Sequence, residues 1–255
     1  VITPKQVPNL ENIQMVQCGA RHTVILSKQG TVLSCGSNHL GQLGFKSETT
    51  TQSVFAEVKF DSEVKDISCG KDFTVFLLEN GKVFTCGNNL AAQLGLGTSD
   101  IGHSLPEEVT GVPHITQIAC IDARTFCVAE DGALWGFGSR RNAESYLGDS
   151  YSPVKVEIQK VQWISRGDGN HCIVRDNNGS TWGFGENGRK QLGFSSNRIV
   201  SDITRIPEDY VFAFSDGNNI LSVYQQIKNR EIYVSSMLGN NLGLLIVYRP
   251  MKKWK

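Results

Sequence analysis

The sequence predicts an all-β protein, specifically a β-propeller of about five four-stranded blades. Three observations carry this prediction. A six-residue segment recurs every 51 residues, a second segment recurs in the same register, and two short apolar runs flank a glycine turn inside each repeat. A period near 50 residues is typical of small supersecondary units that bury their apolar faces only by stacking on their neighbours.

The first landmark is Cys18-Gly-Ala-Arg-His-Thr23. It returns as Cys69-Gly-Lys-Asp-Phe-Thr74 and, less well kept, as Cys120-Ile-Asp-Ala-Arg-Thr125. A fifth, faint repeat has Ser215-Asp-Gly-Asn218 in its place. The recurrence makes the chain a repeat protein and sets the boundaries of its units.

The second landmark is Cys35-Gly-Ser-Asn-His-Leu-Gly-Gln-Leu-Gly44, which returns at 86–95 and, with Phe in place of Cys, at 184–193. The third copy, 137–148, carries extra residues before its Leu-Gly, and only Leu242-Gly243 of a fifth is left. Because each repeat hides its apolar residues against the next, four leucines are expected at equivalent buried positions. They are Leu43, Leu94, Leu147 and Leu192.

Within one repeat the pattern is that of strands. Two β-branched runs flank Gly30, and the turn recurs as Asn80-Gly81, Asp131-Gly132 and Asn178-Gly179, pairs suited to a hairpin that needs positive φ. Further short apolar stretches, such as 106–109 and 115–119, precede the hairpin. Four strands in about 50 residues, without helical periodicity, indicate a propeller blade.

Composition is consistent with a single domain over 1–248, followed by a short basic tail at 249–255. Lys and Arg total 25, as do Asp and Glu, so no global field favours nucleic acid or a basic partner. No apolar run approaches the roughly 20 residues that span a bilayer, and no signal-peptide pattern is present. The first residue, Val1, suggests that the natural chain begins earlier.

The seven cysteines favour neither a metal site nor a disulfide framework. Three share one repeat position, two share another, and no C-x-x-C pair occurs. We therefore expect no metal and no cofactor. Unpaired thiols are easiest to maintain in a reducing compartment, which predicts an intracellular protein of the cytosol or nucleus.

A literal G-x-G-x-x-G string occurs at Gly183–Gly188, but the repeat's own second landmark follows it where a dinucleotide fold requires a helix. His22 and His171 stand in first-landmark loops, and aspartates stand in the equivalent loops. As chemistry this is a ring of His and Asp around one mouth of the propeller. As structure, the histidines hydrogen-bond within their blade and the aspartates shape turns. Equivalent loops collect on one face, where repeat proteins usually bind.

These landmarks and the Pro-x-x-Val stretch between them resemble the repeat of the regulator of chromosome condensation family. The resemblance covers nearly the whole chain and implies a propeller, commonly of seven blades. Five repeats then mean either a small closed ring or a missing piece.

The resemblance further implies a guanine-nucleotide exchange factor for a small GTPase such as Ran, and no covalent-chemistry site is seen. The family's exchange factors also use a protruding hairpin as a wedge, for which 45–54 and 96–105 are the candidates. The resemblance extends to members that intracellular bacteria deliver into host cells, where the host cytosol would be the site of action. The alternative is a non-catalytic interaction scaffold. The implied partner-binding residues are Arg21, Asp72, Asp122, Asp168 and Asp216.

Overall fold

The chain folds as a β-propeller of five consecutive four-stranded antiparallel sheets, which confirms the predicted class. The computed structural model describes side chains in 6–8, 10–138, 151–158, 160–166, 171–188, 192 and 203–206. Of the strands in 199–202, 210–216, 219–226, 231–238 and 241–245 it describes the backbone alone. Within these described residues there is no helix, and hence none that could cross a membrane.

Each repeat supplies one blade, with its strands paired in chain order. Blade 1 contains β1 (Ile13–Cys18), β2 (His22–Ser27), β3 (Val32–Ser37) and β4 (Thr51–Val58). Blade 2 contains β5 (Val64–Cys69), β6 (Phe73–Leu78), β7 (Val83–Asn88) and β8 (Gly102–Glu108). Blade 3 contains β9 (Ile115–Ile121), β10 (Arg124–Ala129), β11 (Leu134–Phe137) and β12 (Val154–Val156). Blade 4 contains β13 (Val161–Ile164), β14 (His171–Asp176), β15 (Thr181–Glu186) and β16 (Ile199–Arg205). Blade 5 contains β17 (Tyr210–Asp216), β18 (Asn219–Gln226), β19 (Glu231–Leu238) and β20 (Asn241–Leu245).

The predicted hairpin turns join the second and third strands of blades 1 to 4. Their glycines Gly30, Gly81, Gly132 and Gly179 have φ values between +75° and +84°. These values lie in the left-handed region, which a glycine enters without the steric cost of a Cβ. The turns therefore set the two-stranded core of each blade, as the sequence predicts.

The hydrophobic core lies between blades. One cluster joins blade 2 to blade 3, a second joins blade 3 to blade 4, and a third joins blade 1 to blade 2. Leu43, Leu94 and Leu192 are each at most 1% exposed, which confirms their equivalent burial. Leu147 lies outside the described residues.

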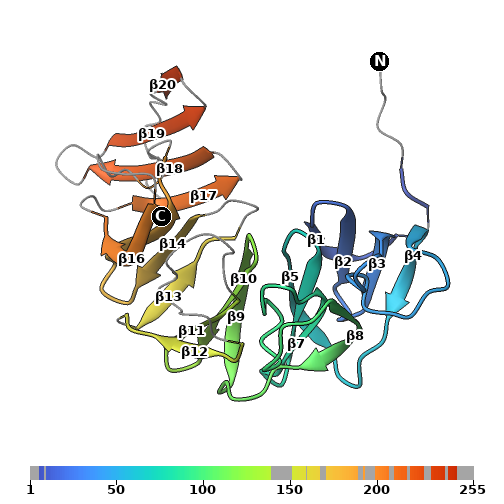
Figure 1. Ribbon diagram of the computed structural model, residues 1–255. Helices are drawn as coiled ribbons and strands as arrows, with labels where there is room; N and C mark the ends of the chain where they lie inside the picture. Colours follow the sequence, from blue (N-terminus) through green and yellow to red (C-terminus); the bar gives the residue numbers. More distant parts are fainter. Residues whose placement is uncertain are drawn as a thin grey trace.

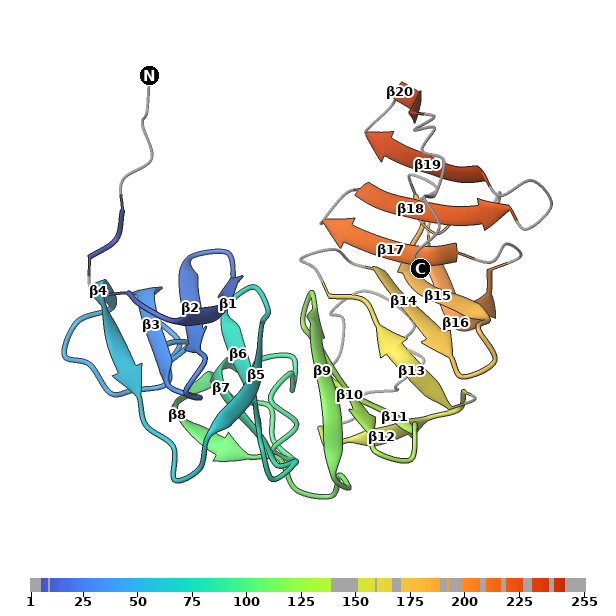
Figure 2. The same ribbon diagram turned by 180° about the vertical axis from the view of Figure 1, so that it is seen from behind.

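The blades follow one another around an arc (Figures 1 and 2). First strands of neighbouring blades contact each other near the axis of the arc, while β4, β8 and β12 lie toward its outside. In both views the strands of blade 1 and blade 5 lie at opposite ends of the arc. The basic tail at 249–255 lies outside the described residues, so the assignment of 1–248 to one domain stays a prediction.

Candidate partner-binding face

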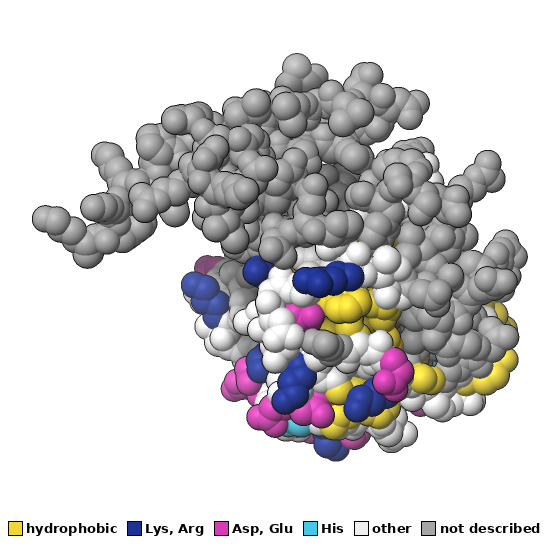
Figure 3. Space-filling view, turned by 90° about the vertical axis from the view of Figure 1, so that its left-hand side faces the viewer, with side chains coloured by type: hydrophobic (Ala, Val, Ile, Leu, Met, Phe, Trp, Pro, Cys, Tyr) yellow, Lys and Arg dark blue, Asp and Glu magenta, His cyan; other side chains and the backbone are white. Residues whose placement is uncertain are grey.

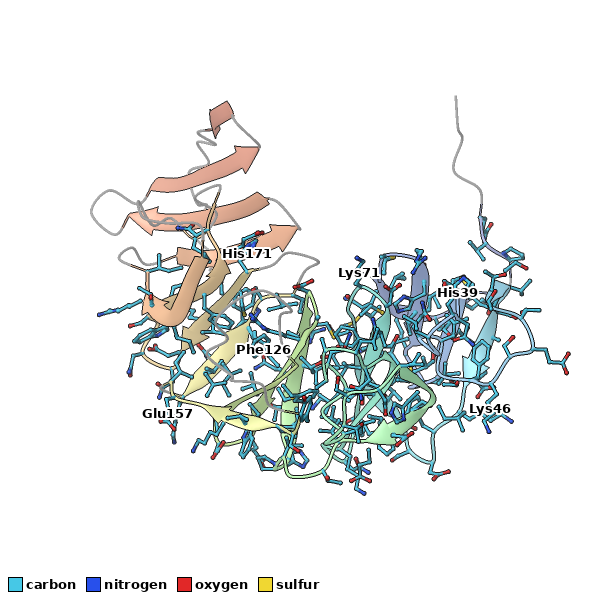
Figure 4. All side chains as sticks on the ribbon, in the orientation of Figure 1. His39, Lys46, Lys71, Phe126, Glu157 and His171 are labelled. Atoms are coloured by element: carbon cyan, nitrogen blue, oxygen red, sulfur yellow. The ribbon has the colours of Figure 1, made fainter. Side chains whose placement is uncertain are left out.

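The two landmarks of a repeat meet at one end of its blade. In blade 1, Ser37 N donates to Arg21 O at 2.7 Å, and Gly36 (φ +108°) lies so close to the first landmark that a Cβ there would be 2.5 Å from Arg21 O. Blade 2 repeats this bond from Asn88 N to Asp72 O at 2.9 Å. We call the end of the blades that bears both landmarks the landmark face; the opposite end, with the hairpin turns, is the hairpin face. Lys71, His39 and His171 all lie on the landmark side of the arc (Figure 4).

A ring packs over a glycine inside the first landmark. A Cβ on Gly19 would lie 2.2 Å from His22 Cε1, and one on Gly70 would lie 1.9 Å from Phe73 Cε1. Both rings are buried. The glycine of Cys-Gly-x-x-His-Thr is therefore required because the ring three residues later lies directly against it. The His can be replaced by another flat ring, as Phe73 shows in blade 2.

The His and Thr of the landmark join neighbouring blades. His22 Nε2 lies 3.0 Å from Thr74 Oγ1, and the Thr74 hydroxyl donates to the backbone carbonyl of Gln42 at 2.7 Å. At the next interface Thr125 Oγ1 donates to Gln93 O at 2.8 Å. The expectation that His22 bonds within its own blade is thus wrong, because the ring faces the following blade.

His22 is a neutral structural residue in this setting. Desolvation by burial lowers its pKa from 6.5 to about 4, although the charge of Asp72 acts in the opposite direction. A histidine that resists protonation at neutral pH suits an interface of hydrogen bonds and apolar contacts. This placement agrees with the structural interpretation of His22.

The predicted site residues are only partly brought together. Arg21 Nη2 lies 3.2 Å from Asp72 Oδ1 across the boundary between blades 1 and 2, with side-chain exposures of 60% and 9%. Asp122 is half-buried in the turn after β9, with φ +56°. Asp168 lies outside the described residues, and of Asp216 only the backbone, at the end of β17, is described.

The expectation that the aspartates form an exposed acidic ring is wrong at Asp72. Asp72 is buried because its carboxylate faces the interface between blades, where Arg21 pairs with it. The charged side chains exposed in the first-landmark loops of blades 1 and 2 are Arg21 and Lys71, which are basic. Around the side of the molecule, acidic and basic side chains alternate over the described surface (Figure 3). Lys71 was missed because the prediction followed the aspartates of these loops, although Lys71 occupies the same repeat position as Asp122.

An ion pair across the axis of the arc was also missed. Arg166, which follows β13, donates from Nη1 to Asp66 Oδ1 at 2.8 Å, and its Nη2 pairs with Asp66 Oδ2. Asp66 lies on β5 and is buried, so blade 4 is tied to blade 2 by a bidentate pair. Arg166 occupies the repeat position that Cys120 and its equivalents occupy in blades 1 to 3. This replacement of a cysteine by an arginine was the sequence signal that could have indicated an ion pair.

The structure also describes the surroundings of the cysteines and of the G-x-G-x-x-G string. Within the described residues, no group of three or more His, Cys, Asp or Glu side chains could hold a metal ion. The G-x-G-x-x-G string lies in β15 and the loop after it. Cys120 is buried between blades, and desolvation raises the pKa of its thiol to about 12.

Comparison with known proteins identifies the repeats. Two models of the regulator of chromosome condensation (RCC1) repeat match, one over 13–42 and 64–93 and the other over 29–77 and 80–128. The human RCC1-like G exchanging factor-like protein is 28% identical over 88% of this chain, and the chain spans 50% of it. The human probable E3 ubiquitin-protein ligase HERC4 is 32% identical over 73% of this chain and is covered to 23%. The chain thus spans about half, or less, of the length of these relatives.

Solved propellers share the fold. The crystal structure of human WBSCR16 superposes with a TM-score of 0.73 at 22% identity, covering 88% of this chain and 61% of that one. Prp20p from Saccharomyces cerevisiae, studied for its binding to Gsp1p and histones, gives 0.58 at 16% identity, covering 88% and 72%. With its repeats matched by two models within 13–128, the chain belongs to the regulator of chromosome condensation repeat family.

Proposed function

We propose that this chain is a protein-binding propeller that acts as a guanine-nucleotide exchange factor for a small GTPase of the Ran type, through its landmark face. The supporting observation is the similarity to the RCC1-like G exchanging factor-like protein along most of the chain. The landmark face suits this role, because loops from successive blades converge there on a rigid scaffold.

Exchange needs no covalent chemistry from this protein. A factor of this kind binds the nucleotide-free GTPase more tightly than the loaded one and so shifts the population toward release. The contacts it must weaken are those of the phosphates and the magnesium ion. On the landmark face the exposed groups that are suited to contact a partner are Arg21 and Lys71, one from each of the first two blades. Asp72 contributes by holding Arg21 in place.

The test is release of labelled GDP from a panel of small GTPases, with Ran first. We expect acceleration at substoichiometric concentrations of the chain. The double variant Arg21→Gln/Lys71→Gln should slow release by about 10-fold and weaken its dependence on salt, because steering by surface charge is screened. Lys28→Gln/Lys160→Gln removes the same charge from exposed positions on the hairpin face and should leave the rate unchanged.

A non-catalytic scaffold is the second candidate. It is favoured by the similarity to HERC-type ubiquitin ligases, of whose length this segment corresponds to about a quarter or less. A scaffold binds its partner without accelerating nucleotide release. Stoichiometric binding with unchanged GDP release from every GTPase in the panel would therefore replace the exchange-factor proposal with this one.

We also propose an intracellular location, in the cytosol or nucleus. It is supported by the seven cysteines, none of which is joined in a disulfide. A reducing agent should then leave the Tm unchanged. The resemblance to effectors of intracellular bacteria rests on the sequence pattern alone.

A further inference from the structure

A loop of blade 2 presents an apolar side chain beside the landmark face. It is the segment 97–101, which leads from the second landmark into β8. Gly102, the first residue of β8, pairs with Asn88, and the Asn88 N–H donates to Asp72 O in the first landmark. At the end of the loop Ile101 is 73% exposed, more than any other large hydrophobic side chain that the structure describes. The contacts that fix this loop therefore fix an exposed apolar group next to the landmark face.

Charged side chains tie the loop to β8. His103 Nε2 lies 3.1 Å from Asp100 Oδ2 in the loop, and His103 Nδ1 lies 2.5 Å from Glu107 Oε1 farther along β8. A neutral imidazole carries one N–H, whereas the imidazolium carries two. Because both ring nitrogens face a carboxylate oxygen, both contacts are hydrogen bonds only while the ring is protonated. The geometry therefore requires the charged form of His103.

The surroundings of the ring favour the same charged form. Desolvation acts to lower the pKa of His103, but hydrogen bonds and charges from Glu107 and Asp100 outweigh it and raise the pKa above its ordinary value. The neighbouring segments contribute uncharged residues: Gly87 pairs with His103 from β7, and Gly41 of blade 1 approaches its backbone carbonyl. The two carboxylates are thus the charged groups that set the protonation of the ring.

The equivalent loop of blade 1 is held without charge. The three charged residues of blade 2 are replaced there by Thr49, Gln52 and Ala56, each 51 positions earlier. Thr49 Oγ1 donates to the backbone carbonyl of Thr51 at 2.8 Å and lies 3.2 Å from Ser47 Oγ. Hydroxyl groups do not titrate in the range where a histidine does. Of these two loops, the one in blade 2 alone is built to respond to pH.

We propose that Asp100, His103 and Glu107 form a pH-sensitive latch, which holds the loop 97–101 against β8 while the imidazole is protonated and releases it as pH rises. The shorter contact, to Glu107, keeps the Nδ1–H, so Nε2 is the nitrogen that loses its proton. Its lone pair then faces the Asp100 carboxylate, and an attraction becomes a repulsion.

The released loop gains motion but stays attached. Asn89 Nδ2 still donates to Asp100 Oδ1 at 3.1 Å, and Ser99 Oγ still donates to Leu90 O at 3.0 Å, because neither donor titrates in this range. Raising the pH therefore frees the position of Ile101 without unfolding the blade. The presentation of this apolar group changes with pH whichever partner the landmark face binds.

NMR of the intact chain, labelled at the δ1 methyl groups of isoleucine, tests the latch. The Ile101 methyl reports the loop, and the ring resonances of His103 report its protonation. From about pH 5.5 to about pH 9.5 we expect both signals to titrate with one midpoint. Above that midpoint the order parameter of the Ile101 methyl should fall. The methyl of Ile118, which is fully buried, should stay constant.

Variants that copy blade 1 remove the latch one part at a time. His103→Gln should make the Ile101 signal independent of pH. Glu107→Ala and Asp100→Thr should each lower the midpoint of His103, because each removes a carboxylate that favours the charged ring. The matched control is His114→Gln, at an exposed histidine beside the hairpin turn of Gly81, and the Ile101 titration should match that of the parent chain.

Limited digestion with proteinase K measures the release directly. At the acidic end of the range, the parent chain should be cut within 97–101 about 5-fold more slowly than His103→Gln, since partly exposed ion pairs hold the loop only modestly. At the alkaline end the two chains should be cut at the same rate. Comparing the two chains at each pH removes the pH dependence of the protease itself.

Three results would overturn the latch. An Ile101 signal that does not follow the titration of His103 means that the ring does not hold the loop. A His103 midpoint that is unchanged in both Glu107→Ala and Asp100→Thr means that the ring does not lie between the two carboxylates. A pH response of Ile101 that persists in His103→Gln means that another group is the sensor.

Discussion

The first landmarks of blades 2 and 3 solve the same packing problem with different residues. In blade 2, Phe73 lies on Gly70, and both are needed together because a Cβ at Gly70 would overlap the ring. In blade 3 the same two positions hold Arg124 and Ile121, with no glycine and no ring. The comparison teaches that the two replacements in the landmark of blade 3 belong together. A flexible arginine side chain leaves room for the isoleucine side chain, whereas a flat ring leaves room only for a glycine.

The threonine bond between blades survives this exchange, and one blade later a cysteine takes the place of the threonine. Thr125 still donates to the preceding blade, as Thr74 does. In blade 4 the equivalent residue is Cys172, which is fully buried against blade 3. Apolar packing therefore persists at the three interfaces whose cores are described, and a threonine donates across the first two of them.

The largest expected effect on the free energy of unfolding comes from placing only one of the two blade 3 residues at its equivalent position in blade 2. Gly70→Ile should lower the free energy of unfolding by about 3 kcal/mol or more, because the side chain overlaps the Phe73 ring. Urea unfolding of Gly70→Ile, Phe73→Arg and the double variant measures the coupling. The double variant should cost less than the two single changes together. Strictly additive costs would show that the two positions are independent, and Gly188→Ala, with open space around it, is the control.

A second prediction concerns acid stability at the boundary of blades 1 and 2. The folded pKa of His22 is about 4 and its ordinary value 6.5, so between these values the unfolded chain binds the proton that the folded chain refuses. Stability is therefore lost as pH falls through this window, by about 3 kcal/mol. His22→Phe, which copies blade 2, should remove this part of the loss in urea unfolding followed from pH 7 to pH 4.

The control for this experiment is His39→Gln, at an exposed position, and its pH profile should match that of the parent chain. His103 contributes with the opposite sign. Desolvation lowers its pKa, but hydrogen bonds and charges of Glu107 and Asp100 outweigh this and raise it. Its stabilisation is present at low pH and is lost as pH rises, so it cannot imitate the effect of His22. An unchanged acid profile in His22→Phe would contradict the assignment of the buried neutral ring.

The smallest expected effects test the polar link itself. Thr74→Val and Thr125→Val each remove the hydroxyl that pairs with a loop carbonyl and should cost about 1 to 2 kcal/mol. In blade 4, Cys172→Val removes only a thiol and should cost less. Equal losses in all three variants, measured by urea unfolding, would mean that the threonine bonds add nothing beyond packing.

The sequence alone determined the features that depend on local chemistry and on repetition. Positive-φ glycines marked the turns, alternating apolar runs marked the strands, and the recurrence of Leu43 marked the core, because a repeated unit in a repeated setting must bury the same positions. Family membership followed from the same strings.

Tertiary structure decided what depends on partners distant in the chain. The sequence could not show that Asp72 turns inward to Arg21, because a landmark loop borders two blades and the neighbour decides which side chains stay in water. Nor could it pair Asp66 with Arg166, since that contact depends on the curvature of the arc. Val16 is 51% exposed whereas Ile67, 51 residues later at the same repeat position, is fully buried, because what surrounds a repeat position depends on the structure beside its blade and not on the repeat itself.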